Sequence, residues 1–354
     1  MYLDLFKSTS SIKLILQHII NLVQLFNNTL SNKFNLNKIA MTNVIISDFD
    51  ETITKKDSIL VFGQLPYYKD PEKFPKWTHY TDNYMQGWNK YSNQAPLRRL
   101  PLLDSVSTET ISHDNYTTLF SKEIQYQDYL RKIELHSTNE LSRLNHFTGI
   151  KYLIPEYINH CFNNKSIEIK DGFQPFLNCI YSHNDIFYVL SINWSREFII
   201  EVINNERLTK TNVFCNALEL KDSEYNGCFS NKLLTGSDKM LYLNHIIKEQ
   251  SKQKNGCKFW YVGDSETDLL SILHPSVNGI LLLDPSENMT KFKNIVNNIL
   301  GLDQNSINKF LRDNVSIIQL PIEKCNKNGV YLAKTWDSIE NLLYNGNITY
   351  HKKN

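Results

Sequence analysis

The chain has 354 residues, a formal net charge of +1 at pH 7, 41% hydrophobic residues and 12% aromatic residues. This length allows one large domain or two smaller ones with a substantial core. The near-zero charge argues against a dedicated nucleic-acid-binding surface, and no apolar run is long enough to span a membrane. The 6 cysteines form no CxxC pair and no disulfide-like spacing. We therefore expect free thiols and a cytoplasmic protein.

Residues 1–40 carry a partly helical apolar pattern with a single acidic residue, Asp4. Three interpretations stay open: a dispensable extension, an accessory helix packed on the domain, or a mitochondrial presequence. Presequences are rich in arginine, and this segment contains none. Because the first strand begins just after Met41, we favour a dispensable extension and keep a mitochondrial location as the minor alternative.

The β-branched run Val44–Ile46 predicts a buried strand of a parallel sheet. The strand must stop at Asp48, because a strand interior does not tolerate bare carboxylates. Residues 63–165 follow and are rich in aromatic side chains and helix-like stretches. A structureless loop of that length is implausible in a compact domain, so we predict an inserted helical cap domain. The catalytic core would then comprise residues 41–62 and 166–345, followed by a tail at 346–354.

Predicted strands and helices alternate after Gly172. The expected strands cover residues 186–190, 212–216, 258–262, 278–283 and 329–334. The expected helices cover residues 173–182, 195–204, 236–248, 268–273 and 336–344. This alternation predicts an α/β fold with a Rossmann-like, doubly wound parallel sheet.

Polar residues fall at the ends of predicted strands or the starts of predicted helices in four places. These places are Asp48–Thr52, Ser191, Lys239 and Gly263–Asp268. Each alone could be a turn, a helix cap or a solvated lysine. Three of them directly follow buried β-runs, so a parallel sheet would gather them at the edge where ligands bind. Asp48 and Asp50 would repel each other when dry, and a hard cation such as Mg²⁺ would keep both ionised.

The order and spacing of these motifs resemble the haloacid dehalogenase (HAD) superfamily over residues 43–58 and 171–283. DxDxT follows one strand and GDSxxD follows another. The resemblance implies that Asp48 is the nucleophile, which becomes an aspartyl phosphate. It also implies that Asp50 protonates the leaving group and then activates water. An acid at position 50 favours phosphoester hydrolysis over carbon–halogen cleavage. The chain contains no DKTGT sequence, so an ion-pumping ATPase is not supported.

The resemblance also implies which residues bind substrate. Ser191 would donate a hydrogen bond to a phosphoryl oxygen, and Lys239 would offset its negative charge. Thr52 would orient Asp50, and Asn193 would join the substrate-binding set.

The metal ligands that the resemblance implies are Asp48, Asp264 and the main-chain carbonyl of Asp50, with Mg²⁺ as the cofactor. Asp268 would be a further ligand or an anchor behind the ligands. Many members of the superfamily have glycine where this chain has Glu51, so this chain carries extra negative charge beside the site.

A cap between the first and second motifs looks like the phosphoserine-phosphatase-like branch. The stretches around residues 171–173, 190–195, 216–220 and 261–270 are similar to HAD domains fused to thiaminase-II-like domains in plants, which dephosphorylate thiamine monophosphate, and to stand-alone fungal relatives. We therefore expect a Mg²⁺-dependent phosphomonoester hydrolase acting on a small phosphorylated metabolite, with thiamine monophosphate or another cofactor phosphate as the leading substrate. The alternatives are a phosphoserine or sugar-phosphate phosphatase and a non-catalytic regulatory protein. Ile192–Trp194, where phosphoserine phosphatases usually have glycines, argues against phosphoserine.

Aromatic residues in the predicted cap could stack on a heteroaromatic substrate or fill the core of the cap. These residues are Trp77, Tyr80, Tyr84 and Trp88, with Trp194 beside the phosphate site. Arg98 and Arg99 could meet an acidic substrate or lie in solvent. We expect no nucleic-acid or membrane partner, and the sequence leaves the oligomeric state open.

Overall fold

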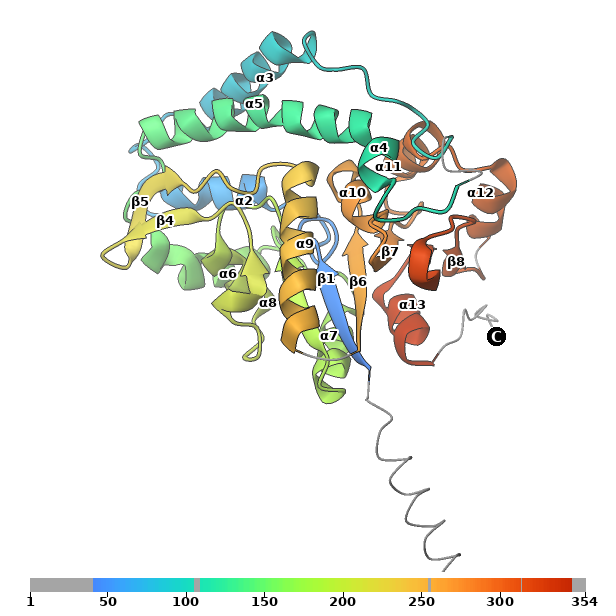
Figure 1. Ribbon diagram of the computed structural model, residues 1–354. Helices are drawn as coiled ribbons and strands as arrows, with labels where there is room; N and C mark the ends of the chain where they lie inside the picture. The colour runs from blue at the N-terminus through green and yellow to red at the C-terminus, as the bar shows by residue number, and fades with distance from the viewer. Residues whose placement is uncertain (1–40, 105–108, 254–255, 313, 346–354) are drawn as a thin grey trace, which may run out of the picture.

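The computed structural model describes residues 41–104, 109–253, 256–312 and 314–345 (Figure 1). The predictions for residues 1–40 and 346–354 therefore lie outside the described residues. The framework is a seven-stranded sheet in the order β3-β2-β1-β6-β7-β9-β8. Its strands are β1 (Thr42–Ser47), β2 (Ile186–Leu190), β3 (Val213–Phe214), β6 (Cys257–Gly263), β7 (Val277–Leu282), β8 (Ile317–Gln319) and β9 (Val330–Ala333).

β1 lies at the centre of the sheet, hydrogen-bonded in parallel to β2 on one side and to β6 on the other. Its residues Val44–Ile46 are fully buried, as expected of a strand covered on both faces. The predicted α/β fold with a doubly wound, mostly parallel sheet is confirmed. One edge differs, because β8 pairs antiparallel with β9. The short connection through residues 320–329 contains no crossover helix, which a parallel pair would need.

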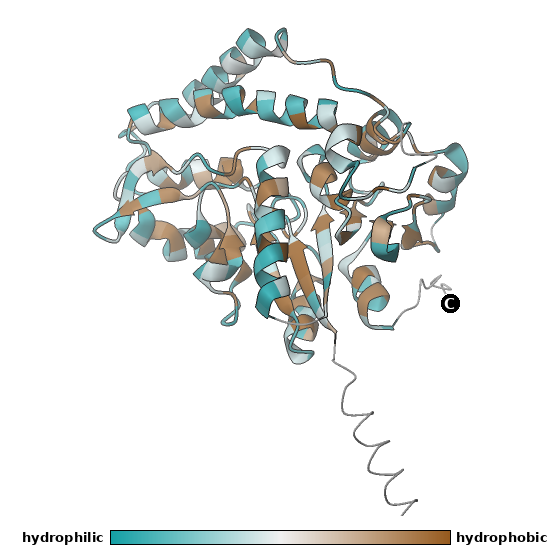
Figure 2. Ribbon diagram, viewed as in Figure 1, coloured by the Kyte–Doolittle hydropathy of each residue, from teal (hydrophilic) through white to brown (hydrophobic). Residues whose placement is uncertain are grey.

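Side chains of β1 alternate between two core clusters. Val44 and Ile46 belong to a cluster that includes residues of α9, α10, α11 and α12, and Ile45 belongs to a cluster that includes residues of α7, α8 and α13. These helices are α7 (Phe173–Ser182), α8 (Arg196–Ile203), α9 (Gly236–Gln253), α10 (Leu269–Ile272), α11 (Met289–Lys293), α12 (Gln304–Phe310) and α13 (Trp336–Glu340). Figure 2 shows the brown of β1 behind the mostly teal outer face of α9. No helix in the described ranges is long and apolar enough to cross a membrane.

A helical insertion separates β1 from β2, as predicted. Its helices are α2 (Ile59–Gln64), α3 (Trp77–Ser92), α4 (Tyr116–Leu119), α5 (Ser121–Arg143) and α6 (Ile154–Asn163). α3 and α5 pack together over the carboxyl ends of β1 and β6 (Figure 1). Other parts of the insertion pack on the core: the Leu102 amide donates to Ile299 O at 2.7 Å, and the Tyr116 hydroxyl donates to Leu270 O at 2.5 Å. The domain boundaries at residues 63 and 165 stay a prediction.

The sequence analysis missed an antiparallel hairpin formed by β4 (Leu218–Lys221) and β5 (Glu224–Phe229). Its two loop residues, Asp222 and Ser223, both have positive φ angles, of 50° and 70°. Hairpin loops of this kind usually contain Asn-Gly or Asp-Gly, so the signal in this chain is weak. The hairpin lies near the end of α5. Two residues after β5, Asn231 Oδ1 accepts a hydrogen bond from the Thr138 hydroxyl of α5 at 3.2 Å.

Candidate active site

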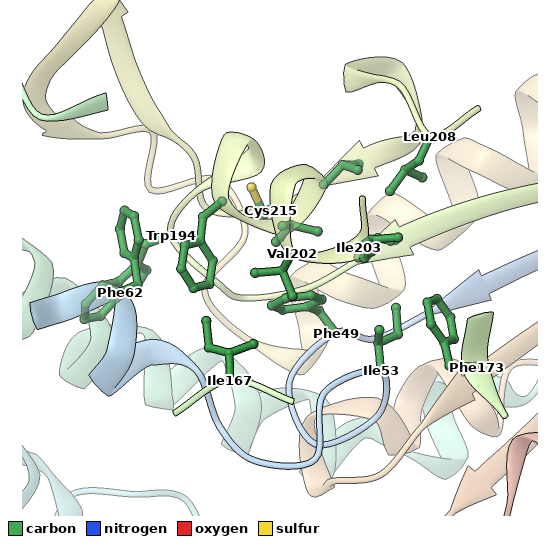
Figure 3. Close-up of a cluster of buried hydrophobic side chains, with 14 of the residues drawn as sticks. Phe49, Ile53, Phe62, Ile167, Phe173, Trp194, Val202, Ile203, Leu208 and Cys215 are labelled. Atoms are coloured by element: carbon green, nitrogen blue, oxygen red, sulfur yellow. The ribbon is translucent and has the colours of Figure 1, made fainter. Parts of the chain in front are cut away.

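The loop after β1 is fixed by the residue between its two carboxylates. Phe49 is fully buried and lies in a cluster of apolar side chains that includes Ile53 (Figure 3). The Ile53 amide donates to Phe49 O at 2.8 Å, and Glu51 has a φ of 55°. This left-handed conformation is the one that glycine adopts most readily. The tight turn holds Asp48 and Asp50 at the sheet edge.

Lys239, in the first turn of α9, lies fully buried between two carboxylates. Its Nζ is 2.9 Å from Asp48 Oδ1 and 2.8 Å from Asp268 Oδ1. Burial alone would lower the pKa of Lys239, but the charges of Asp268 and Asp48 outweigh it and raise the pKa. Burial raises the pKa of Asp48, and Lys239 acts in the opposite direction. Lys239 is thus a permanent cation at the point where the predicted nucleophile lies.

Asp268 is surrounded by donors. Its Oδ1 accepts from Lys239 and, at 2.8 Å, from the Tyr261 hydroxyl. Its Oδ2 accepts from the amides of Asp264 and Ser265 at 3.2 and 3.1 Å, and from the Ser265 hydroxyl at 2.9 Å. Burial would raise the pKa of Asp268, but Lys239 and these hydrogen bonds lower it. Of the two roles that the sequence left open, this geometry favours the anchor.

Asp264 lies at the end of β6 and makes two contacts that the sequence did not predict. The Thr52 hydroxyl donates to Asp264 Oδ1 at 2.6 Å, whereas we expected it to orient Asp50. The turn after β1 carries Thr52 back toward the end of β6 instead. Lys291 of α11 forms ion pairs with Asp264 Oδ2 and with Glu51 Oε2. Burial raises the pKa of Asp264, and Lys291 acts against it. The negative charge of Glu51 is therefore compensated.

One carboxylate oxygen each of Asp48, Asp264 and Asp268 lies within 4.8 Å of the other two. An all-oxygen set of buried carboxylates has the chemistry that Mg²⁺ prefers. Among the described residues, Asp268 accepts from five donors, whereas Asp264 accepts from two and Asp48 is paired with Lys239 alone, so Asp48 and Asp264 are the better ligands. The Asp50 carboxylate does not belong to this cluster, and the prediction that its main-chain carbonyl binds metal stays a prediction.

Asp50 is oriented by two neighbours. Its Oδ1 accepts from the Ser58 amide at 2.8 Å and from the Ser58 hydroxyl at 2.5 Å, and its Oδ2 accepts from Asn193 Nδ2 at 3.0 Å. Burial and the nearby charge of Asp57 raise the pKa of Asp50 to about 6, although the hydrogen bonds from Asn193 and Ser58 act in the opposite direction. A carboxyl group with this pKa can both give and take a proton near neutral pH.

Ser191 follows β2 at the same edge of the sheet. Val189 of β2 pairs with Ser47 of β1, which places Ser191 level with the start of the loop after β1. The Asn193 amide donates to the Ser191 hydroxyl oxygen at 3.1 Å, and both side chains are fully buried. The structure therefore brings the second motif beside the first, as the alternation of strands predicted.

Sequence reasoning missed Lys291, Ser58 and Tyr261. Lys291 lies on a separate short helix without a motif, and Ser58 and Tyr261 act only through the carboxylates that they contact. Arg98, considered as a substrate ligand, instead forms a buried ion pair with Glu123.

No protein-family model matches the chain. The chain is 42% identical over 312 residues to cold tolerance protein 1 of Saccharomyces cerevisiae. This match covers 86% of this chain and 98% of that protein. It is 22% identical over 313 residues to a CTO1 family protein of Schizosaccharomyces pombe, covering 83% and 97% of the two chains. A solved phosphoserine phosphohydrolase-like protein from Francisella tularensis is 15% identical, with a TM-score of 0.41 over 77% of this chain and 100% of that one. The extent and identity of the Saccharomyces match show that the chain belongs to the family of cold tolerance protein 1.

Proposed function

We propose that this protein is a phosphomonoester hydrolase that works through an aspartyl phosphate. The observation that carries the proposal is the buried ion pair of Asp48 with Lys239, next to a second carboxyl group, Asp50, whose pKa lies at about 6. The two acids have different environments, one paired with a cation and the other hydrogen-bonded by neutral donors. Such a difference separates a nucleophile from an acid–base group.

In the proposed first half-reaction, an Asp48 oxygen attacks phosphorus and the bond from phosphorus to the ester oxygen breaks. Asp50 gives its proton to that oxygen, so the alcohol leaves neutral. In the second half-reaction, Asp50 takes a proton from water, whose oxygen attacks phosphorus and releases phosphate from Asp48. Lys239 offsets the charge on the phosphoryl oxygens in both steps. Mg²⁺, held by Asp48 and Asp264, would stabilise the same charge when bound.

The finer expectations also belong to this proposal. The substrate is a small phosphorylated metabolite, with thiamine monophosphate or another cofactor phosphate as the leading candidate. All six cysteines are free, which is in keeping with the cytoplasmic location that we propose.

The test is phosphate release from thiamine monophosphate, pyridoxal phosphate, flavin mononucleotide, phosphoserine and sugar phosphates, with Mg²⁺ or with EDTA. Release that needs Mg²⁺ and disappears in Asp48→Asn would support the proposal. Asp128→Asn, an exposed acid of α5, is the matched control and should keep full activity. No release from any ester by folded, Mg²⁺-loaded protein would instead favour a regulatory role.

A further inference from the structure

A cavity of about 550 Å³ lies between the helical insertion and the core. One wall comes from α3 and α5, and the opposite wall comes from the start of α2 and the segment after β2. The aromatic residues Trp77, Tyr80, Tyr84 and Trp194 line it. This volume falls within the range of small-molecule sites in proteins. Three of the four insertion aromatics singled out in the sequence therefore face one space, whereas Trp88 is not among the lining residues.

The cavity adjoins the proposed catalytic groups. Asp57, which lines it, precedes Ser58, whose amide and hydroxyl both donate to Asp50. Ile192, which also lines it, lies between Ser191 and Asn193. The same two loops thus build the cavity wall and hold Asp50. Because Asp50 would protonate the departing oxygen, the leaving alcohol must lie on this side of the phosphoryl group.

The cavity wall is acidic. Asp57 and Glu134 are its ionisable carboxyl groups, and none of its lining residues, all within the described chain, is a lysine or arginine. The Tyr84 hydroxyl donates to Glu134 Oε1 at 3.2 Å. Burial raises the pKa of Glu134 to about 7, and the Tyr84 hydrogen bond acts in the opposite direction. A leaving group with its own negative charge would be repelled here, whereas a cation or an N–H donor would find an acceptor.

We propose that this cavity is the leaving-group site and that it selects phosphate esters of flat aromatic alcohols carrying a positive charge or an N–H donor for Glu134. The inference rests on the proposed phosphatase activity. The aromatic lining supplies faces for a planar ring, and Glu134 sets the sign of the substituent charge. Esters whose alcohol carries a carboxylate, phosphoserine among them, are poor substrates on this view.

The test uses three aryl phosphates that share a ring and differ only in the group opposite the phosphate. They are 4-(aminomethyl)phenyl, 4-methylphenyl and 4-carboxyphenyl phosphate, which carry a cation, no charge and an anion. The wild type should have kcat/KM values in that falling order. Glu134→Gln should reduce the preference for the cationic over the neutral ester about tenfold. Taking the ratio between wild type and variant cancels the different chemical reactivity of the esters.

Tyr84→Phe provides a second, milder variant, because it removes only the hydrogen bond to Glu134. Asp128→Asn removes an exposed acid of the same helix and should leave the order unchanged. A preference for the cationic over the neutral ester that is equally large in the wild type and Glu134→Gln, or a wild-type preference for the carboxyphenyl ester, would overturn the leaving-group site.

A binding measurement separates this inference from the proposed activity. Calorimetric titration with 4-(aminomethyl)phenol should show binding to the wild type that weakens in Glu134→Gln. Binding of that phenol without hydrolysis of any ester would keep the cavity assignment and reject the phosphatase. Hydrolysis of all three esters at rates independent of the substituent charge, without binding of the phenol, would keep the phosphatase activity and reject the cavity assignment.

Discussion

A small number of neighbours sets the pKa of Asp50. Variants of two of these neighbours should therefore shift the pH dependence of activity in opposite directions. Burial and Asp57 raise the pKa to about 6, and Asn193 and Ser58 oppose them. The protonated form is needed to give a proton to the leaving group. For an alkyl phosphate, kcat/KM should therefore fall as the pH rises through about 6. Asp57→Asn should move this fall to lower pH, and Ser58→Ala should move it to higher pH, each by about half a pH unit.

The measurement is the pH profile of kcat/KM for the wild type and both variants with one alkyl phosphate, so that ionisation of the substrate cancels. 4-Nitrophenyl phosphate is the control, because its leaving group needs little protonation and its profile should respond much less. Shifts of the two variants in the same direction would show that Asp50 does not control the fall.

Lys291 offers a prediction about metal affinity. Its ammonium pairs with Asp264, which we propose as a metal ligand, and with Glu51. Removing it should leave the carboxylates free for a cation, so Lys291→Met should bind Mg²⁺ about tenfold more tightly. Glu51→Gln should weaken binding, because Lys291 would then pair with Asp264 alone. Lys293→Met, on the exposed face of the same helix, is the control.

Calorimetric titration with Mg²⁺, supported by electron paramagnetic resonance with Mn²⁺, measures this affinity without any need for turnover. A loss of Mg²⁺ binding in Lys291→Met would mean that Lys291 holds Asp264 in place for the ion.

Two of the site residues that the sequence predicted have positions that follow from a strand end. Asp48 and Asp264 come directly after buried strands, so the sheet itself brings them together. Thr52, Lys291 and Ser58 differ, because their roles depend on side-chain directions in turns and on a distant short helix. A pattern of residue types along the chain carries no information about those directions.

At the scale of elements, α5 is tied to the catalytic core by a buried ion pair. Arg98 donates to both Glu123 oxygens, at 2.5 and 2.7 Å, and to Glu266 Oε2 at 2.6 Å. The Glu123 side chain is fully buried. Arg98→Met should leave this carboxylate unpaired and lower the free energy of unfolding by about 3–5 kcal/mol. Arg143→Met, which breaks an exposed pair with Glu140, should cost about 0–1 kcal/mol.

Urea unfolding followed by circular dichroism compares the two arginine variants directly. Equal losses of stability would show that α5 is not held through Arg98. The same contact links the insertion to the segment before α10, so we also expect Arg98→Met to lower kcat more than Arg143→Met does.

The accuracy of the predicted elements follows the strength of their local signals. The helix at residues 173–182 and the strand at 186–190 were predicted with the observed bounds, because the helix has an apolar periodicity and the strand is an uninterrupted apolar run. The β4–β5 hairpin was missed because its turn lacks glycine at the two positions of positive φ. The antiparallel edge strand β8 has only three residues, which is too short for a recognisable alternation.

At the scale of the whole molecule, the sheet gathers the proposed catalytic groups and the insertion lines the proposed leaving-group site. The motifs lie within residues 43–58 and 171–283, and α3 and α5 lie between those two stretches. On the proposed function, phosphate chemistry and substrate choice are therefore encoded in different parts of the chain. This separation explains why the sequence predicted the reaction more sharply than the substrate.

The last prediction concerns the segment before β1. The amino end of β1 is held by contacts within the described chain: the Thr42 amide donates to Gly256 O at 3.1 Å, and Asn43 bonds to Asp185 and Trp260. A protein that begins at Met41 should therefore keep the melting temperature and the kcat/KM of the full chain. Thermal unfolding and phosphate release on both proteins test this directly. A lower melting temperature of the shortened protein would reject the dispensable extension in favour of an accessory helix, because lost packing lowers stability whereas a removed targeting peptide does not.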